Sequence, residues 1–350
     1  MKIATIVGAR PQFIKAATIS RIIQEKSDIQ EIIIHTGQHY DDNMSEVFFT
    51  ELNIPRPHYN LGVGSSMHGK QTAKMLEGIE EILVKEKPDW IIVYGDTNST
   101  VAGALAAAKL HIPIAHIEAG LRSYNRRMPE EINRIATDHI SDVLFAPTQN
   151  ALNILKQEGL AERSLFSGDV MYDSILYYKE ISRSKVKLED IADVQPDRYF
   201  LATIHRQENT DDIKRLQEIF LAFSEFDIPI IVPLHPRTKN ILDDVAFRSN
   251  VKIISPVGYL EMVCLTSNCI KVFTDSGGLQ KEAYFLKKPC ITLREETEWI
   301  ETLEGGWNFT VGADKQKILD KVHYCNYEPQ KEYFGDGKAA EKIINYLLKK

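Results

Sequence analysis

Short apolar runs and amphipathic segments alternate along the whole chain, and this alternation is the strongest constraint on its fold. The apolar runs have the length of strands, and helical periodicity lies between them, as in Ile79 with Ile82 and Leu83. Strands that alternate with helices predict parallel βαβ units. The expected strands cover residues 2–7, 30–35, 89–94, 113–117, 142–146, 199–203, 228–232, 251–254, 270–273 and 289–293.

The two halves of the chain share this rhythm, and its 350 residues are enough for two domains with separate cores. The simplest architecture is α/β, with two doubly wound, Rossmann-like domains facing each other across a cleft. We expect the first domain at 1–169 and the second at 170–334. A C-terminal helix within 335–350 is expected to pack back on the first domain, and the polar stretch 183–197 is expected to be a loop.

Composition and charge exclude several classes of partner. The formal net charge is −7, and Lys and Arg do not concentrate anywhere enough to predict a nucleic-acid surface. No apolar run approaches the ~18–20 residues of a membrane span. The chain enters a strand at Lys2 without a secretory segment, and its four cysteines form no C-x-x-C pair, which indicates buried thiols in a reducing compartment. These features predict a cytoplasmic protein that binds neither nucleic acid nor membrane.

Three acidic motifs follow one another in the first half of the chain. They are GDTNST with Asp96, HIEAG with Glu118, and MPEEINR with Glu130 and Arg134. Asp96 and Glu118 each follow an expected strand, and open parallel sheets bind ligands beyond the carboxyl ends of their strands. Helix capping would explain any single motif of this kind. Three in succession favour carboxylates that serve as acids and bases at the rim of a site.

A second set of motifs is typical of phosphate binding. Ser276, Gly277 and Gly278 follow the expected strand 270–273 and open a helix, whose free N–H groups favour an anion. Glu282, about two turns into this helix, could accept hydrogen bonds from ribose hydroxyls; the alternative is a Ser-capped helix with a surface Glu. Arg10, just before Pro11 at the end of the first strand, offers a second phosphate contact.

Two histidines lie just past neighbouring expected strands. His205 and His235 each have an Arg nearby, which suits a diphosphate, although a structural hydrogen-bonding role is the alternative. No G-x-G-x-x-G follows a strand, and no G-x-x-x-x-G-K-[ST] occurs, which argues against bound NAD and against a nucleoside triphosphatase. No spacing of His, Cys and acidic residues resembles a zinc site. We therefore expect no cofactor and no metal.

Six motifs, in this order, resemble the non-hydrolysing UDP-N-acetylglucosamine 2-epimerases, and they are spread over roughly residues 1–335. They are GARPQ with Arg10, GDTNST with Asp96, HIEAGLR with Glu118, PEEINR with Glu130 and Arg134, IHRQEN with His205, and DSGGLQKE with Glu282. The resemblance implies the two-domain glycosyltransferase-B fold, a homodimer, a UDP-sugar substrate, and catalysis without metal or nicotinamide.

The reaction implied by the resemblance interconverts UDP-GlcNAc and UDP-ManNAc for the synthesis of surface polysaccharide precursors. UDP is eliminated to a 2-acetamidoglucal and then added back with the other configuration at C2. By position in the family motifs, Asp96, Glu118 and Glu130 would be the acid/base and sugar-ring carboxylates, oriented by Arg134. The remaining implied contacts are His205 and Arg10 with the diphosphate, Ser276, Gly277 and Gly278 with phosphate, and Glu282 with the ribose.

The chain departs from the family pattern at two places. Gln38–Asp42 differs from the Q-H-R-x-M of members that UDP-GlcNAc activates, which predicts an enzyme without this activation. Thr297-Glu298-Trp299 replaces T-E-R-P and looks more like the branch that acts on UDP-2,3-diacetamido-2,3-dideoxy-glucuronate. A 2-epimerase of that sugar is therefore an alternative. A UDP-sugar glycosyltransferase of the same fold and a non-catalytic nucleotide-sugar sensor are the others, and both leave the three acidic motifs unexplained.

Overall fold

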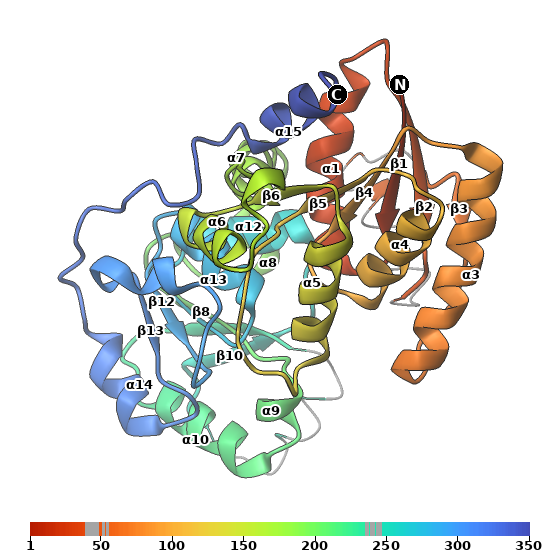
Figure 1. Ribbon diagram of the computed structural model, residues 1–350. Coiled ribbons are helices and arrows are strands. Elements are labelled where there is room, and N and C mark those ends of the chain that lie inside the picture. The colour runs from red at the N-terminus through yellow and green to blue at the C-terminus, as the bar shows by residue number, and fades with distance from the viewer. Residues whose placement is uncertain (39–48, 51–52, 54–55, 235–237, 239–241, 243–246) are drawn as a thin grey trace. The chain divides into compact units, whose positions relative to one another are not determined.

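The computed structural model describes residues 1–38, 49–50, 53, 56–234, 238, 242 and 247–350 (Figure 1). The chain forms two compact units, one made of Met1–Ser174 with Glu332–Lys350 and the other of Ile175–Lys331. Each unit contains a parallel β-sheet with helices between its strands. The predicted α/β class, with two Rossmann-like parallel-sheet domains, is confirmed.

In the described part of the first unit the strand order is β3-β2-β1-β4-β5-β6-β7, and neighbouring strands pair in parallel. The strands are β1 (Lys2–Val7), β2 (Gln30–His35), β3 (Tyr59–Asn60), β4 (Trp90–Tyr94), β5 (Ile114–Ile117), β6 (Val143–Ala146) and β7 (Ser164–Phe166). The helices are α1 (Arg10–Gln24), α3 (His68–Glu86), α4 (Asn98–Lys109), α5 (Pro129–Ile140), α6 (Gln149–Gln157), the 3₁₀ turn η1 (Ala161–Arg163) and α15 (Ala339–Leu347). Helix α15 packs against α1 (Figure 1).

In the described part of the second unit the order is β10-β9-β8-β11-β12-β13, again with parallel pairs. The strands are β8 (Phe200–Thr203), β9 (Ile230–Pro233), β10 (Val251–Ile254), β11 (Lys271–Thr274), β12 (Cys290–Thr292) and β13 (Asn308–Thr310). The helices are α8 (Leu188–Ile191), α9 (Gln207–Thr210), α10 (Ile213–Ser224), α12 (Tyr259–Asn268), α13 (Gly277–Phe285), η2 (Ile300–Gly306) and α14 (Lys315–Val322). Helix α7 (Val170–Lys185) crosses from the first unit into the second.

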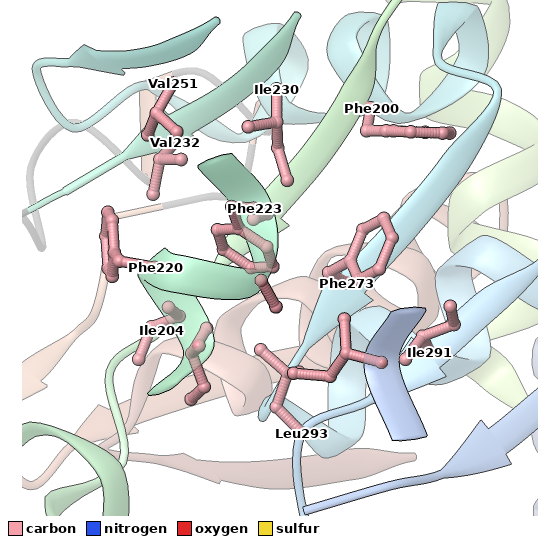
Figure 2. Close-up of a cluster of buried hydrophobic side chains, with 14 of the residues drawn as sticks. Phe200, Ile204, Phe220, Phe223, Ile230, Val232, Val251, Phe273, Ile291 and Leu293 are labelled. Carbon is pink, nitrogen blue, oxygen red and sulfur yellow. The ribbon is translucent and has the colours of Figure 1, made fainter. Parts of the chain in front are cut away.

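Each sheet is buried because its strands are rich in Ile, Val, Leu and Phe, as expected for parallel strands covered by helices. Figure 2 shows the second unit's core, where Phe220 and Phe223 of α10 pack onto the sheet with Phe273 of β11. Phe223 and Phe273 meet edge-on, with ring centroids 5.5 Å apart. A second cluster, with Ile6, Ile34 and Val93 among its members, fills the first unit between its sheet and α3 and α4.

The structure corrects three expectations. Helix α7 runs to Lys185 and α8 spans Leu188–Ile191, so the stretch 183–197 is not simply a loop. Leu188 and Ile191 pack against the core there, although polar neighbours hide them in the sequence. Strands β3 and β13 were not expected, because runs of two or three residues carry no readable periodicity. Cys264, Cys269 and Cys290 are buried, but Cys325 is exposed in the irregular stretch after α14.

The strand orders place a topological switch point in each sheet. In the first unit β1 has β2 on one side and β4 on the other, and in the second unit β8 lies between β9 and β11. Connections on the two sides of such a point lead to opposite faces of the sheet and leave room for a ligand beyond the strands' carboxyl ends. The residues that follow β1, β4, β8 and β11 are therefore the first place to search for a site in each unit.

Candidate active site

Arg10, Asp96 and Glu118 lie just beyond the carboxyl ends of β1, β4 and β5. These three strands are consecutive neighbours in the sheet, so the structure brings the three loops together at its switch point. Arg10 is the first residue of α1 and is partly buried. The side chain of Gln12 ties the first two loops, because its Oε1 accepts from Gly8 N at 2.9 Å and its Nε2 donates to Tyr94 O at 2.9 Å.

Glu118 forms a buried ion pair with Lys15 of α1. The Lys15 ammonium contacts Glu118 Oε2, and the two residues are 6% and 9% exposed. An opposite charge at this range favours the ionised form of a carboxyl group. Lys15 was not among the predicted site residues, although a lysine inside the apolar run Phe13-Ile14-Lys15-Ala16-Ala17 is a readable signal.

The backbone at Glu118 is strained, with a φ of 70° in the left-handed region. Such a conformation costs a non-glycine residue on the order of 1–3 kcal/mol. The amides of Glu118 and Ala119 both donate to Phe145 O, at 3.2 and 3.1 Å, and hold the loop in this conformation. Gly95 makes room for the ion pair, because a Cβ built on it would lie 3.2 Å from both Glu118 Oε2 and Lys15 Nζ.

Asp96 is held by Arg134 of α5. Arg134 Nε donates to Asp96 Oδ2 at 3.2 Å, and its Nη2 contacts the same oxygen. Loss of solvation raises the pKa of Asp96 above its ordinary value, while the Arg134 charge acts in the opposite direction. Glu118 and Lys15 are close enough to influence this pKa as well, so the two carboxylates and their cations form one group.

Glu131, and not Glu130, is the second carboxylate on Arg134. Arg134 Nη1 donates to Glu131 Oε2 at 3.0 Å, and Glu131 is 1% exposed. Its two oxygens also accept from the amides of Ser123 and Tyr124, each at 2.9 Å, and so shape the loop before α5. Glu130 is exposed in the first turn of α5. Arg134 was expected to orient the catalytic carboxylates, and the structure brings it to Asp96 and Glu131.

In the second unit, His205 follows β8 and faces Asp275, which follows β11. His205 is exposed, and its Nδ1 lies 3.1 Å from Asp275 Oδ1. Burial alone would raise the pKa of Asp275, but hydrogen bonds from His205, the Arg206 amide and Asn209 hold it below its ordinary value. Asp275 was not among the predicted site residues, although an acidic residue directly after a strand, within DSGG, is a readable signal.

Helix α13 begins at Gly277, and Ser276 is its N-cap with its side chain accepting from Leu279 N. A Cβ at Gly278 would meet only Ser276 Oγ, at 3.8 Å, so the backbone is open to a ligand there. At Gly277 a Cβ would lie 2.6 Å from Glu298 Oε1. Glu282 is 7% exposed, so it is not a surface residue of this helix.

The segment with Trp299 lies against the same helix. Trp299 is buried, and Lys281 Nζ lies 3.7 Å from the centroid of its ring. Thr297 Oγ1 donates to Gln280 Oε1 at 2.7 Å. The Thr297-Glu298-Trp299 motif is therefore folded onto the first turns of α13, next to the expected phosphate site.

Two sequence-predicted features lie partly or wholly outside the described residues. His235 lies outside them, and so do residues 39–42 of the loop in which activated family members carry Q-H-R-x-M. Gln38, where that loop begins, accepts from Ser99 N at 3.0 Å and thus contacts the start of α4. Among the residues described, no group of three or more His, Cys, Asp or Glu side chains is arranged to hold a metal ion. Within the same described residues, no helix has the length and apolarity that a membrane crossing needs.

Comparison with known proteins places the chain among sugar-nucleotide epimerases. The family model described as UDP-N-acetylglucosamine 2-epimerase matches residues 21–348. A UDP-N-acetylglucosamine 2-epimerase homolog of Methanococcus maripaludis is 54% identical, covering 99% of each chain. The UDP-2,3-diacetamido-2,3-dideoxy-D-glucuronate 2-epimerase of Pseudomonas aeruginosa is 49% identical, covering 100% of each. The crystal structure of Methanocaldococcus jannaschii UDP-GlcNAc 2-epimerase with UDP-GlcNAc and UDP superimposes with a TM-score of 0.91, at 45% identity and 100% coverage of both chains.

Proposed function

The chain belongs to the UDP-N-acetylglucosamine 2-epimerase family, and we propose that it interconverts UDP-GlcNAc and UDP-ManNAc without hydrolysing them. The observation that carries the proposal is the group of carboxylates and cations beyond β4 and β5. Asp96 with Arg134 and Glu118 with Lys15 supply an acid and a base side by side, as a proton transfer at a sugar carbon requires.

The chemistry proceeds by elimination and re-addition. The C1–O bond to UDP breaks, the cationic character at C1 acidifies the C2 proton, and a carboxylate takes that proton to leave a 2-acetamidoglucal. UDP then adds back to C1, and C2 receives a proton on the opposite face. We assign Glu118 as the base, because Lys15 favours its ionised form, and Asp96 as the acid, because its pKa is raised. Glu130, exposed in the first turn of α5, is proposed to contact the sugar ring.

The leaving UDP needs a site that favours negative charge. The start of α13 at Ser276, Gly277 and Gly278 supports phosphate binding, and His205, Arg10 and His235 are proposed to stabilise the diphosphate. Glu282 is proposed to bind the ribose. In this division the domain 1–169 carries the carboxylates and the domain 170–334 binds UDP. The homodimer and the cytoplasmic location stay predictions.

A second substrate is favoured by one observation. The buried Trp299, whose ring faces Lys281, belongs to the Thr297-Glu298-Trp299 segment, where the family's UDP-GlcNAc enzymes commonly carry T-E-R-P. The 49%-identical Pseudomonas aeruginosa relative is named a UDP-2,3-diacetamido-2,3-dideoxy-D-glucuronate 2-epimerase. The same elimination would act on that sugar, whose additional groups are a C3 acetamide and a C6 carboxylate. We therefore retain UDP-2,3-diacetamido-2,3-dideoxy-glucuronate as the second candidate.

Solvent deuterium tests the proton transfer. When UDP-GlcNAc is incubated with the protein in D2O, without added cofactor or acceptor, we expect UDP-ManNAc with deuterium at C2, followed by labelling of the substrate pool. Proton NMR of the sugar signals measures both. Epimerisation without label at C2 would rule out proton abstraction, and sugar transfer that needs an acceptor would instead identify a glycosyltransferase.

The two candidate sugars are separated by initial rates. We expect hyperbolic kinetics, without activation by UDP-GlcNAc, because Tyr40 and Asp41 replace the Arg-containing pattern of activated members and Asp41 would repel a second diphosphate. We also expect the diacetamido uronate to be turned over at least as well as UDP-GlcNAc. Rates are measured for each sugar alone and with traces of the other. Sigmoidal curves would contradict the first expectation, and turnover of UDP-GlcNAc alone would contradict the second.

A further inference from the structure

His116 is a fully buried histidine on β5, two residues before Glu118, and both of its ring nitrogens are bonded. Nδ1 lies 2.7 Å from Asp138 Oδ1, and Nε2 lies 2.8 Å from the carbonyl oxygen of Gly95. His116 and Asp138 are each 0% exposed. The mechanism proposed above gives this pair no role, although it lies directly behind the loops that carry Asp96 and Glu118.

The partners determine how many protons the ring carries. A backbone carbonyl has no proton to give, so Nε2 must be an N–H donor to Gly95. Asp138 Oδ2 accepts from Arg122 Nη1 at 2.7 Å and from Gly120 N at 3.2 Å, and the positive charge of Arg122 favours the carboxylate form of Asp138. Burial alone would raise the pKa of Asp138, but the hydrogen bonds and charges of His116 and Arg122 hold it below its ordinary value. Nδ1 must therefore be a donor too.

We infer that His116 is held as the imidazolium cation and acts as a positioning residue for Asp96 and Glu118. Its Nε2 fixes the carbonyl of Gly95, the residue before Asp96, where the backbone has a φ of 60°. Its partner Asp138 fixes the amide of Gly120, two residues after Glu118, at a φ of 83°. One buried ion pair thus holds the backbone beside both carboxylates.

The neighbouring charges keep the cluster balanced. Arg122 donates to both oxygens of Glu158, at 2.8 and 2.6 Å, and His139 Nε2 lies 3.4 Å from Glu158. Two cations, His116 and Arg122, thus face two carboxylates, Asp138 and Glu158. If His116 were neutral and Asp138 protonated, the Arg122 guanidinium would lose half of its counter-charge, which is costly for a buried cation.

Nitrogen NMR tests the charge without reference to catalysis. In protein labelled with ¹⁵N-histidine at neutral pH, we expect both ring nitrogens of His116 to carry protons, because each faces an acceptor oxygen. The His116→Gln variant assigns the signal. An unprotonated ring nitrogen on His116 at neutral pH would overturn the inference.

Kinetics test the positioning role, which rests on the proposed epimerase function. We expect His116→Gln and Asp138→Asn each to lower kcat by roughly 10²-fold, because a small displacement of catalytic groups has an effect of this size. Affinity for UDP, whose proposed contacts are mostly on the other unit, should stay the same. The double variant should be no worse than the worse single one, since the pair acts as a unit. His323→Gln is the matched control and should keep wild-type kcat.

The outcomes separate the two proposals. If the wild-type protein showed no epimerase activity while both ring nitrogens of His116 carried protons, the proposed function would be wrong and the charge assignment would hold. Variants that fold, bind UDP and retain kcat would overturn the positioning role. If either variant is too unstable to assay, the NMR result on the wild-type protein still decides the charge of His116.

Discussion

Replacing Glu118 with Gln is expected to lower kcat by ~10²–10⁴-fold, the usual span for a general acid or base, and to leave UDP affinity unchanged. The amide has nearly the same shape and can still contact Lys15, but it cannot take the C2 proton. Asp96→Asn should act in the same way on the return of the proton. Steady-state rates by NMR and UDP binding by calorimetry measure the two effects separately.

Glu282→Ala is the matched comparison. Its proposed ribose contact is the same in ground and transition states, so the variant should bind UDP more weakly and raise KM with little change in kcat. Calorimetry that found UDP affinity abolished in Glu118→Gln would reverse the assignment of the two ends of the site. Wild-type kcat in Glu118→Gln would exclude this carboxylate as the base.

The fold was readable from the sequence because parallel strands are buried on both faces and appear as continuous apolar runs. Lys2–Val7 and Trp90–Tyr94 are of this kind, and β1 was predicted with both of its ends. Tyr59–Asn60 and Asn308–Thr310 were missed, because edge strands this short have no pattern of their own. Helix α8 was predicted as part of a loop, because a short helix with only two apolar side chains, Leu188 and Ile191, resembles a polar loop in the sequence.

The site was readable where its residues follow strands and unreadable where tertiary contacts select a partner. Asp96 and Glu118 stand out because they end β4 and β5. Lys15 does not, because it is 103 residues from Glu118 in sequence and meets it only through the pairing of β1 with β4 and of β4 with β5. Glu130 and Glu131 are adjacent in one motif, and only the geometry of the helix shows that the buried Glu131 is the partner of Arg134. Nothing in the sequence predicted the left-handed backbone of Glu118.

Lys15→Met is expected to have the second large effect, on stability as well as on rate. It removes the cation from a buried pair and leaves Glu118 without a counter-ion, which typically lowers the free energy of unfolding by ~3–5 kcal/mol. Urea unfolding measures this loss. Lys2→Met is the matched control, because Lys2 forms its ion pair with Glu86, at 3.3 Å, near the surface, where 30% of the Lys2 side chain is exposed. Surface ion pairs of this kind contribute at most about 1 kcal/mol to stability.

The same variant should also change the pH dependence of catalysis. Without Lys15, burial disfavours the charged carboxylate, so the pKa of Glu118 should rise. A base works only when deprotonated, so the acidic limb of the kcat profile should move to higher pH, and part of the lost rate should return as the pH is raised. The double variant Lys15→Met/Glu118→Gln should be more stable than Lys15→Met, because no buried charge is then left unpaired. If the double variant were less stable than Lys15→Met, the stability lost in Lys15→Met would come from the packing of the Lys15 side chain and not from the unpaired charge of Glu118. An unmoved acidic limb would mean that Glu118 is not the base whose ionisation limits the rate.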